Sequence, residues 1–579
     1  MTSRYPVVGF FKNQIEKTIR NPARVPIIIA DRVNRIFRRA FIGPVRRLSR
    51  AAILSVERLT LQFDRWQTAF VPSVEVAAPL ESDVPSVEVA APLEYDFGNE
   101  SEQDFGNDAR SIFEAGIRAL DDVRIAKAVR LLMRAATLDC STSDVGSLWI
   151  KREACKNLGV ALHNGLGRLD EAVCWWRESE RICHLITNHY GFSDASKSQV
   201  YDHFWSGHIG HTALLGLVVK RHLLTGQDDQ KRYLIGAPLQ NIGNRYLVEQ
   251  MGRFFTLIDD STQFAFPQEY ANAFVNFFYI DNRLSGPATY PWQVFAEVSR
   301  AWEEKGRCPL LAFSSDELEL GQKRRAAIGI PPSAWHVCLH VRAPGFKLHH
   351  DDLHASLNAD IATYDLAIDA VVKRGGWVVR MGDPSMPKLP PMRHVIDYAH
   401  SPKKSPEMDI FLSGTCRFFI GTSSGPLYVP ALYGVPSVVT NWFPTGTRPL
   451  NSADLFIPKL HWYEKDEEFA PFDESMAQPI GHVHANPLLS QLDLSLRSNT
   501  REELRDVVVE MLDRLDGEIE YSDEDNQLQS YFDAVALNVR SYGNAHVGRD
   551  FLRKFQHLLP AAQLDYGPAR KWALARANL

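Results

Sequence analysis

The segment from Trp377 to Pro444 alternates short apolar runs with polar turns, a pattern that few folds accommodate. Two runs, Trp377–Met381 and Phe418–Gly421, are typical of buried strands, and the turn after the second run leads into a helical pattern. That turn consists of Gly421, Thr422, Ser423, Ser424 and Gly425. Small residues let the backbone approach a ligand, and hydroxyls with free amides at a helix start suit a phosphate. Because ligands bind at the carboxyl ends of strands in open α/β sheets, the turn indicates a phosphate-bearing ligand such as a nucleotide sugar.

The same alternation of strands and helices extends from residue 201 to the C-terminus. It predicts parallel sheets with right-handed crossovers, arranged as two sheets that face a cleft, with a boundary near residue 330. A final helix over 550–559 is expected to cross back to the first sheet. The predicted strands are 232–238, 253–259, 335–342, 377–382 and 418–421, and the predicted helices are 203–224, 244–251, 360–375 and 500–515.

Residues 109–200 are helical and have repeat character. The units at 113–139 and 157–182 are similar to tetratricopeptide repeats, in which paired helices lie antiparallel. The small residues Gly159 and Ala172 would allow close helix contact. Two units are fewer than a free-standing solenoid needs, so we expect them to pack on the following domain. A scaffolding role and plain core packing both remain open.

The N-terminal part divides sharply by charge. Residues 1–70 contain 14 Lys and Arg against 4 Asp and Glu, and they form a basic helical arm that an anionic membrane surface could bind. Residues 71–108 contain 10 acidic and no basic residues, and include a tandem duplication of VPSVEVAAPLE. Proline, alanine and unpaired acid cannot build a core, so this stretch is predicted to be an extended linker. The arm could equally pack on its own protein.

The composition narrows the class of protein. A length of 579 residues predicts two to four domains, and a net charge of −6 favours no nucleic-acid partner. Seven cysteines without a CxxC pair fit reduced thiols in a cytoplasmic protein. We expect no membrane-spanning helix and no signal peptide, since no apolar run is long enough. The predicted location is cytoplasmic, with possible peripheral contact on the inner membrane.

The end of the predicted strand 335–342 supplies the first candidate ligand-binding side chains. Alternation places His340 and Arg342 on the same side of the strand. An Arg at this edge suits a diphosphate because its fork donates two hydrogen bonds and keeps its charge. Pairing of Arg342 with a local carboxylate is the alternative. In the loop that follows, Asp351 and Asp352 are candidate catalytic bases, although a metal site and a solvated turn remain open.

Two further places offer polar groups to the same cleft. Gly382 and Asp383 follow the strand at 377–382, and the carboxylate could accept from a ribose hydroxyl or a base amine, or could cap the turn. In the earlier sheet, His208 and His211 lie in a glycine-containing turn at a helix start. Either could bind the acceptor or act as a general base, because the pKa of His lies near the working pH, and His211 is the candidate base. A purely structural role is the alternative for each.

Several motifs are absent. Without GxGxxG, a Walker A loop or GxSxG, the sequence disfavours dinucleotide oxidoreductases, P-loop enzymes and α/β-hydrolases. The one DxD string, at 523–525, is predicted to lie in an acidic loop rather than at the end of a strand, which disfavours a metal-dependent sugar transferase. We therefore expect no metal and no cofactor.

The region 335–551 resembles a family of bacterial proteins assigned as glycosyltransferases. Their genes often lie near surface-polysaccharide genes, and some members have tetratricopeptide repeats. The strings that support the resemblance are VCLHVRAPGF, NADIATYDLAI, GGWVVRMGDPSMPKLP, CRFFIGTSSGPLYVPALYGVPSVVTNWFP and NAHVGRDFL. One departure is Leu357, where the family pattern has Arg. More remotely, H-x-R and the small-residue turn resemble those of inverting fucosyltransferases with two Rossmann-like domains (GT-B type).

The resemblance implies an α/β fold of two Rossmann-like domains facing a cleft, at 201–330 and 331–579, with the second binding the donor. It places Arg342 on the donor diphosphate, Asp383 near the nucleotide, and Ser423 and Ser424 in the matching turn. The implied reaction is metal-independent, inverting transfer of a sugar from a nucleotide diphosphate to a glycan, lipid-linked or protein acceptor. A non-catalytic assembly protein with tetratricopeptide repeats and a sugar-nucleotide epimerase are the alternatives.

Overall fold

The computed structural model describes residues 108–560 except 123, 140–143, 190–197, 227–230, 236–241, 259–276, 278, 281–289, 345–354 and 485. The predicted basic arm and the duplicated linker up to residue 107 lie outside the described residues. By contacts the chain divides into two units, 1–88 and 89–579, and every described residue belongs to the second. In the described part of the chain, no helix is long and apolar enough to span a bilayer.

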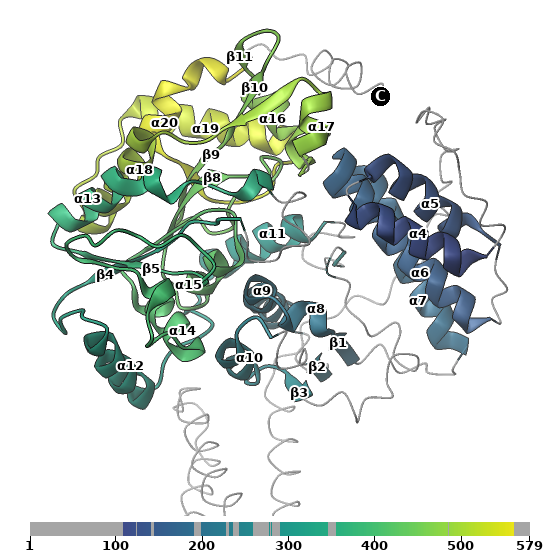
Figure 1. Cartoon of the computed structure of the whole chain (residues 1–579), viewed down its shortest axis with the longest axis horizontal. Coiled ribbons are helices and arrows are strands. Elements are labelled where there is room, and N and C mark those ends of the chain that lie inside the picture. The colour runs from purple at the N-terminus through teal and green to yellow at the C-terminus, as the bar shows by residue number, and fades with distance from the viewer. Residues whose placement is uncertain are drawn as a thin grey trace, which may run out of the picture. The chain divides into compact units, whose positions relative to one another are not determined.

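The helical region that opens the described chain (Figure 1) has its own apolar core. Successive helices pack on each other, and Gly159 is required because a Cβ there would lie 2.3 Å from Trp176 Nε1. The predicted helices are thus present, whereas their assignment to the tetratricopeptide type stays a prediction. The elements are α4 (Ala109–Asp121), α5 (Ile125–Thr137), α6 (Val145–Val160), a π-helical turn η2 (Ala161–Gly165) and α7 (Leu169–His189).

A small parallel sheet follows, with strand order β1-β2-β3. Its first strand was not predicted from the sequence. The helix α11 packs against α9 and closes the core of this sheet. The elements are β1 (Ser198–Tyr201), α8 (His203–Ser206), α9 (Ile209–Thr225), β2 (Lys231–Ile235), α10 (Arg245–Met251), β3 (Thr256–Ile258) and α11 (Pro291–Glu304).

The second sheet has seven parallel strands in the order β13-β9-β8-β7-β4-β5-β6. Counted along the chain from β4, this is the doubly wound order 3-2-1-4-5-6-7, and its direction reverses between β4 and β7. Four of the five interior strands are buried along their whole length, as apolar runs in a parallel sheet predict. The strands are β4 (His336–His340), β5 (Trp377–Arg380), β6 (Val395–Ile396), β7 (Phe419–Gly421), β8 (Ser437–Trp442), β9 (Leu455–Pro458) and β13 (His546–Val547).

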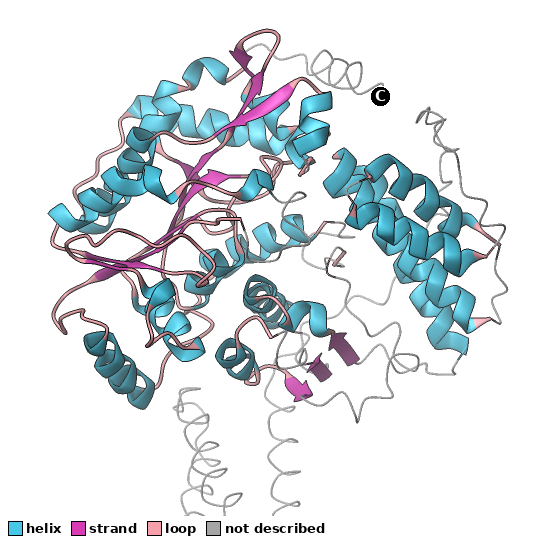
Figure 2. Cartoon of the chain, viewed as in Figure 1, coloured by secondary structure: helices cyan, strands magenta, loops and turns pink. Residues whose placement is uncertain are grey.

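Helices cover both faces of this sheet (Figures 1 and 2). The helices α13 and α18 pack together on one face, while α12, α14 and α15 lie on the other. A three-stranded antiparallel sheet, β11-β10-β12, is attached beyond β9. The added elements are α12 (Ser315–Ala327), η8 (Ile361–Tyr364), α13 (Asp365–Lys373), α14 (Pro406–Thr415), α15 (Val429–Leu432), β10 (Leu460–Tyr463), β11 (Glu468–Phe469), η11 (Ile480–His482), β12 (Leu494–Arg497), α18 (Arg501–Asp516), α19 (Asp523–Asn538) and α20 (Arg549–Lys554).

Three predictions about this region differ from the structure. The acidic string 523–525 is not in a loop but forms the first turn of α19, because Ser522 and Asp525 make a reciprocal capping box. The predicted boundary near residue 330 assigns α12 to the first domain, but α12 packs on α14 of the second sheet. The helix α20 packs on α18 and α19 of the second sheet instead of crossing back; residues 561–579 lie outside the described residues.

The two sheets meet through apolar packing rather than an open cleft along α9. The core of the first sheet continues into Val429 and Leu432 of α15, and a Cβ on Gly216 would lie 2.2 Å from Leu432 Cδ2. The space left between α9 and the loop after β8 is a cavity of only about 30 Å³. The two backbones come close together at Gly210 and Gly425, where a Cβ on Gly210 would lie 2.5 Å from Gly425 Cα. The predicted cleft is therefore filled along this contact.

We expect Gly210→Ala to destabilise the fold, by about 1–3 kcal/mol, because the added methyl group overpacks the contact with Gly425. Ala in a helix is otherwise favoured over Gly by about 1 kcal/mol. The measurement is the thermal melting temperature. Gly146→Ala is the matched control, since Gly146 also lies in the first turn of a helix and its Cβ would meet only Asp144 Oδ1 at 3.4 Å. A melting temperature of Gly210→Ala at or above wild type would contradict the overpacking argument.

Candidate functional site

The candidate site lies at the carboxyl edge of the second sheet, where the strand order reverses between β4 and β7. The backbone N–H of Thr422 donates to His340 O (3.3 Å), and the N–H of Arg342 donates to Thr422 Oγ1 (3.0 Å). The end of β4 and the turn after β7 are therefore neighbours, as their positions in the sequence predicted. A ligand at this edge would meet both.

The hydroxyls of the 421–425 turn are bonded to the protein itself. Ser423 Oγ accepts from Phe443 N (2.9 Å), which joins the turn to the end of β8. Ser424 Oγ lies 3.0 Å from His340 Nδ1, with which it shares a hydrogen bond. Thr422 and Ser423 are buried. The hydroxyls thus fix the shape of the turn in this structure, which the sequence did not indicate.

His340 is a neutral residue of the site rather than a source of positive charge. Burial above all, together with the nearby guanidinium groups of Arg380 and Arg342, lowers the pKa of His340 to about 4. The neutral ring forms one hydrogen bond with Ser424, as donor or acceptor according to its tautomer. Its position holds the turn against β4.

Arg342 lies just after β4 and is half-buried. Its Nε donates to Asn358 Oδ1 at 3.2 Å, and its carbonyl accepts from Ala359 N at 3.0 Å. The side chain is therefore directed toward the loop that precedes η8. The described bond joins Arg342 Nε to an amide oxygen, so both interpretations, a phosphate-binding Arg and an Arg paired with a local carboxylate, stay predictions.

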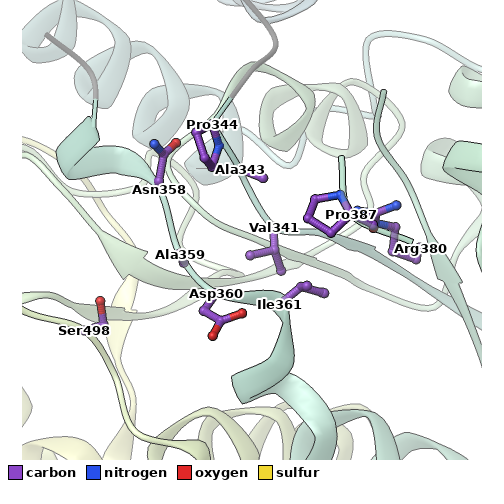
Figure 3. A pocket seen from close by; sticks show the side chains of 10 residues that line it. All are labelled: Val341, Ala343, Pro344, Asn358, Ala359, Asp360, Ile361, Arg380, Pro387 and Ser498. Carbon is purple, nitrogen blue, oxygen red and sulfur yellow. Dashed lines mark hydrogen bonds between the residues drawn. The ribbon is translucent and has the colours of Figure 1, made fainter. Parts of the chain in front are cut away.

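A pocket of about 360 Å³ lies beside Arg342, at the carboxyl ends of β4 and β5 (Figure 3). Val341 lines it, whereas its neighbours His340 and Arg342 do not. Its walls combine apolar surfaces with a few polar groups, which is the composition of small-molecule sites. The lining residues are Val341, Ala343, Pro344, Asn358, Ala359, Asp360, Ile361, Arg380, Pro387 and Ser498.

Buried Arg380 fixes one side of this pocket. Its guanidinium donates to Asp397 Oδ1 (2.9 Å) and to Pro387 O (3.0 Å). Asp397 also accepts from Leu389 N (3.1 Å) and bonds His400 Nδ1 (2.8 Å). This network holds the Pro-rich loop between β5 and β6 against the pocket. The sequence analysis missed Arg380 and Asp397; an Arg inside an otherwise apolar strand was the available signal.

A second buried cation holds the opposite loop. Lys459 Nζ donates to Ser356 O (2.9 Å) and Asn358 O (2.7 Å), and burial lowers the pKa of Lys459 to about 8. The backbone carbonyl of Asn358 therefore accepts a hydrogen bond from Lys459, and its side-chain oxygen accepts one from Arg342. Both loops that line the pocket are fixed by buried positive groups. Lys459 and Asn358 were also missed as site residues, although Asn358 begins the string NADIATYDLAI that supports the family resemblance.

Gly382 and Asp383 lie in the turn after β5. Asp383 Oδ1 accepts from Ser385 N (2.9 Å), so the carboxylate caps its own turn, one of the two predicted alternatives. Gly382 has φ 143°, and a Cβ there would lie 2.4 Å from Met386 Sδ. Neither residue lines the pocket. A contact of Asp383 with a nucleotide stays a prediction.

His208 and His211 stand at the start of α9, whose Gly210 touches the 421–425 turn. The structure thus brings their helix to the edge of the site. His211 Nδ1 bonds Phe204 O at 3.1 Å, and its ring packs on Phe277 at 4.2 Å between centroids. Asp351 and Asp352 lie outside the described residues. In the described part of the chain, no three His, Cys, Asp or Glu side chains gather as a metal site.

Comparison with known proteins adds little to this geometry. No family model matches the chain, and no curated protein matches it. Among solved structures, a glycosyl transferase family 9 protein from Veillonella parvula DSM 2008 is similar over 45% of this chain and 86% of its own length, with 10% identity and a TM-score of 0.28. A similarity of this size supports no argument about fold or function, so both rest on the strands and side chains described above.

The buried, neutral state of His340 predicts a pH dependence of stability. The unfolded chain binds a proton near pH 6.5 while the folded chain does so only near pH 4, so stability is lost as the pH falls through this window. The slope from this residue is up to about 1.4 kcal/mol per pH unit. In His340→Asn, which retains a polar group for Ser424, we expect a smaller fall in melting temperature between pH 7 and pH 5.

The exposed His557→Asn is the control and is expected to keep the wild-type difference between the two pH values. Equal differences in wild type and His340→Asn would show that His340 does not titrate in this window.

Proposed function

We propose that the protein is a glycosyltransferase that moves a sugar from a nucleotide-diphosphate donor to a hydroxyl acceptor. The observation that supports this best is the pocket of about 360 Å³ at the carboxyl edge of a doubly wound sheet, with Arg342 beside it at the strand-order reversal. Sugar transfer in particular, and a place in bacterial surface-glycan synthesis, rest on the sequence resemblance.

In this proposal the nucleoside occupies the pocket. Its volume is at the lower end of the roughly 300–1,000 Å³ usual for small-molecule sites, which suits a base with its ribose. The apolar side chains of Val341, Ile361 and Pro387 offer surfaces for the faces of a base. The polar groups of Asp360 and Ser498 lie at the margin, where they can meet ring edges or ribose hydroxyls (Figure 3).

The diphosphate then lies toward Arg342. Asn358 lines the pocket and also bonds Arg342 Nε, so a group leaving the pocket past Asn358 reaches the guanidinium. A guanidinium remains charged at any working pH and can donate two parallel hydrogen bonds to phosphate oxygens. It stabilises the charge that develops when the bond between the anomeric carbon and the diphosphate oxygen breaks. No metal is needed for this step.

The acceptor hydroxyl attacks the anomeric carbon from the opposite side, with inversion, and a base takes its proton. His208 belongs to the acceptor side, at the start of α9 beside the 421–425 turn, and His211, Asp351 and Asp352 are the candidate bases. The acceptor is a glycan, a lipid-linked sugar or a protein. Asp383 and the 421–425 turn complete the proposed donor side.

Arg342→Ala is expected to weaken binding of the preferred nucleoside diphosphate about 100-fold and to abolish both sugar transfer and donor hydrolysis, because a charge-assisted contact to phosphate is lost. The measurement is calorimetry with uridine, guanosine, cytidine, adenosine and thymidine diphosphates, followed by a donor screen by mass spectrometry. The exposed Arg118→Ala is the charge-matched control. Failure of wild type to bind any of the five would favour the assembly-protein alternative, and isomerised donor without acceptor would favour the epimerase.

Filling the pocket provides an independent test. Ala343→Trp places an indole among the lining residues and is expected to abolish nucleoside-diphosphate binding while inorganic pyrophosphate still binds at Arg342. The same calorimetry measures both ligands. Unchanged affinity for the nucleoside diphosphate would place the nucleoside elsewhere.

A further inference from the structure

The helical region contacts the second sheet through a compact seam that none of the roles above uses. The π-helical turn Ala161–Gly165 and the bend after it meet the loop 478–484. A Cβ on Gly167 would lie 2.0 Å from Pro479 O, and His484 N donates to Asn164 O at 2.9 Å. At the exposed margin, Asp170 bonds Arg540 at 2.6 Å. A π-helical turn within α-helical structure is a distortion often associated with a functional role.

Two buried imidazoles form the centre of this seam. His163 Nε2 lies 3.2 Å from His482 Nδ1, and both side chains are almost fully buried. Burial lowers the pKa of His482 to about 3 and holds the pKa of His163 well below its ordinary value. Both rings are therefore neutral, and one N–H points to the other ring's nitrogen. The ring of Tyr290 packs edge-on against His163, with 5.0 Å between centroids.

The far side of His482 touches the loop that follows β8. A Cβ on Gly446 would lie 2.5 Å from His482 Nε2, and Gly446 N donates to Gly481 O at 2.6 Å. Three residues earlier, Phe443 N donates to Ser423 Oγ at 2.9 Å. Continuous contacts thus lead from His163 through His482 and the 443–446 loop to the turn of the candidate site.

We propose that His163 and His482 are positioning residues, through which the helical region holds the 443–446 loop and thereby the Ser423 turn in its binding shape. The hydrogen bond fixes the plane of the His482 ring, and the absence of a side chain at Gly446 lets the loop pack directly on that ring. The helical region is in this view a structural part of the site and not an independent scaffold. Only the nucleotide readout below rests on the proposed function.

The first test follows amide hydrogen exchange of the full-length, unliganded protein by mass spectrometry. His163→Phe retains a ring of similar size but loses the hydrogen bond, and exchange is expected to rise about tenfold in peptides covering 443–447 and 421–425. His163→Gln can still bond His482 and is expected to stay near wild type. Leu132→Ala, a cavity in the core of the helical region, is the matched control and leaves these peptides unchanged.

Unchanged exchange in His163→Phe, or an equal rise in Leu132→Ala, would overturn the proposal. Asp170→Ala removes the exposed bond to Arg540 at the same seam and keeps the test possible if His163→Phe does not fold. It is expected to raise exchange in 443–447 by a smaller factor, and no rise would again overturn the proposal.

The second test is a double-mutant cycle on the dissociation constant of the nucleoside diphosphate that binds wild type best. His163→Phe and Ser423→Ala are each expected to weaken binding about tenfold, and the double variant no more than Ser423→Ala alone. Independent, multiplicative effects would show that His163 does not act through Ser423. The exchange test needs no ligand. If the protein bound none of the nucleotides, the proposed function would be refuted, but the exchange test would still decide whether His163 and His482 position the loop.

Discussion

The structure depends on the way in which the ends of β4 and β7 are joined at the reversal of the strand order. The chain leaves these neighbouring strands in loops that run to opposite faces of the sheet, which is the place where ligands bind in doubly wound folds. Backbone and hydroxyl groups join the two strand ends through the bonds of Thr422 to His340 and to Arg342. The other parts of the candidate site are loops that lie beside these joined strand ends.

The loops are held by buried polar groups rather than by apolar packing alone. Arg380 fixes the β5–β6 loop through Asp397, and Lys459 fixes the loop at Asn358. Removing such groups from water is costly unless each charge is bonded in the fold. Arg380 satisfies this condition with a carboxylate and a carbonyl, and Lys459 with two carbonyls. The result is a pocket whose walls are preorganised, which reduces the ordering needed when a ligand binds.

Sequence reasoning succeeded where the signal was local. The buried strands β4, β5 and β7 follow from short apolar runs that end in turns, and α18 follows from its amphipathic pattern. It failed where the outcome depended on a distant partner. The predicted cleft along α9 is filled because Gly210 and Gly216 pack closely against residues more than 200 positions away in the sequence. Arg380 was not recognised because its partner Asp397 lies in a loop whose path the sequence does not predict. The capping box of Ser522 and Asp525, which places the acidic string 523–525 in a helix, was missed. Its signal lies within four residues and could have been recognised.

By itself the sequence determined the class of fold, the strands β4, β5 and β7 of the second sheet and the place of the 421–425 turn, because apolar periodicity and glycine placement act over a few residues. The tertiary structure alone decided that the hydroxyls of that turn bond to His340 and Phe443, and that the pocket is lined by Val341. It also decided that two imidazoles 319 positions apart in the sequence meet at a seam. Those outcomes depend on how sheets and helices pack, since hydrogen bonds between distant segments form only when the whole core places their atoms within about 3 Å.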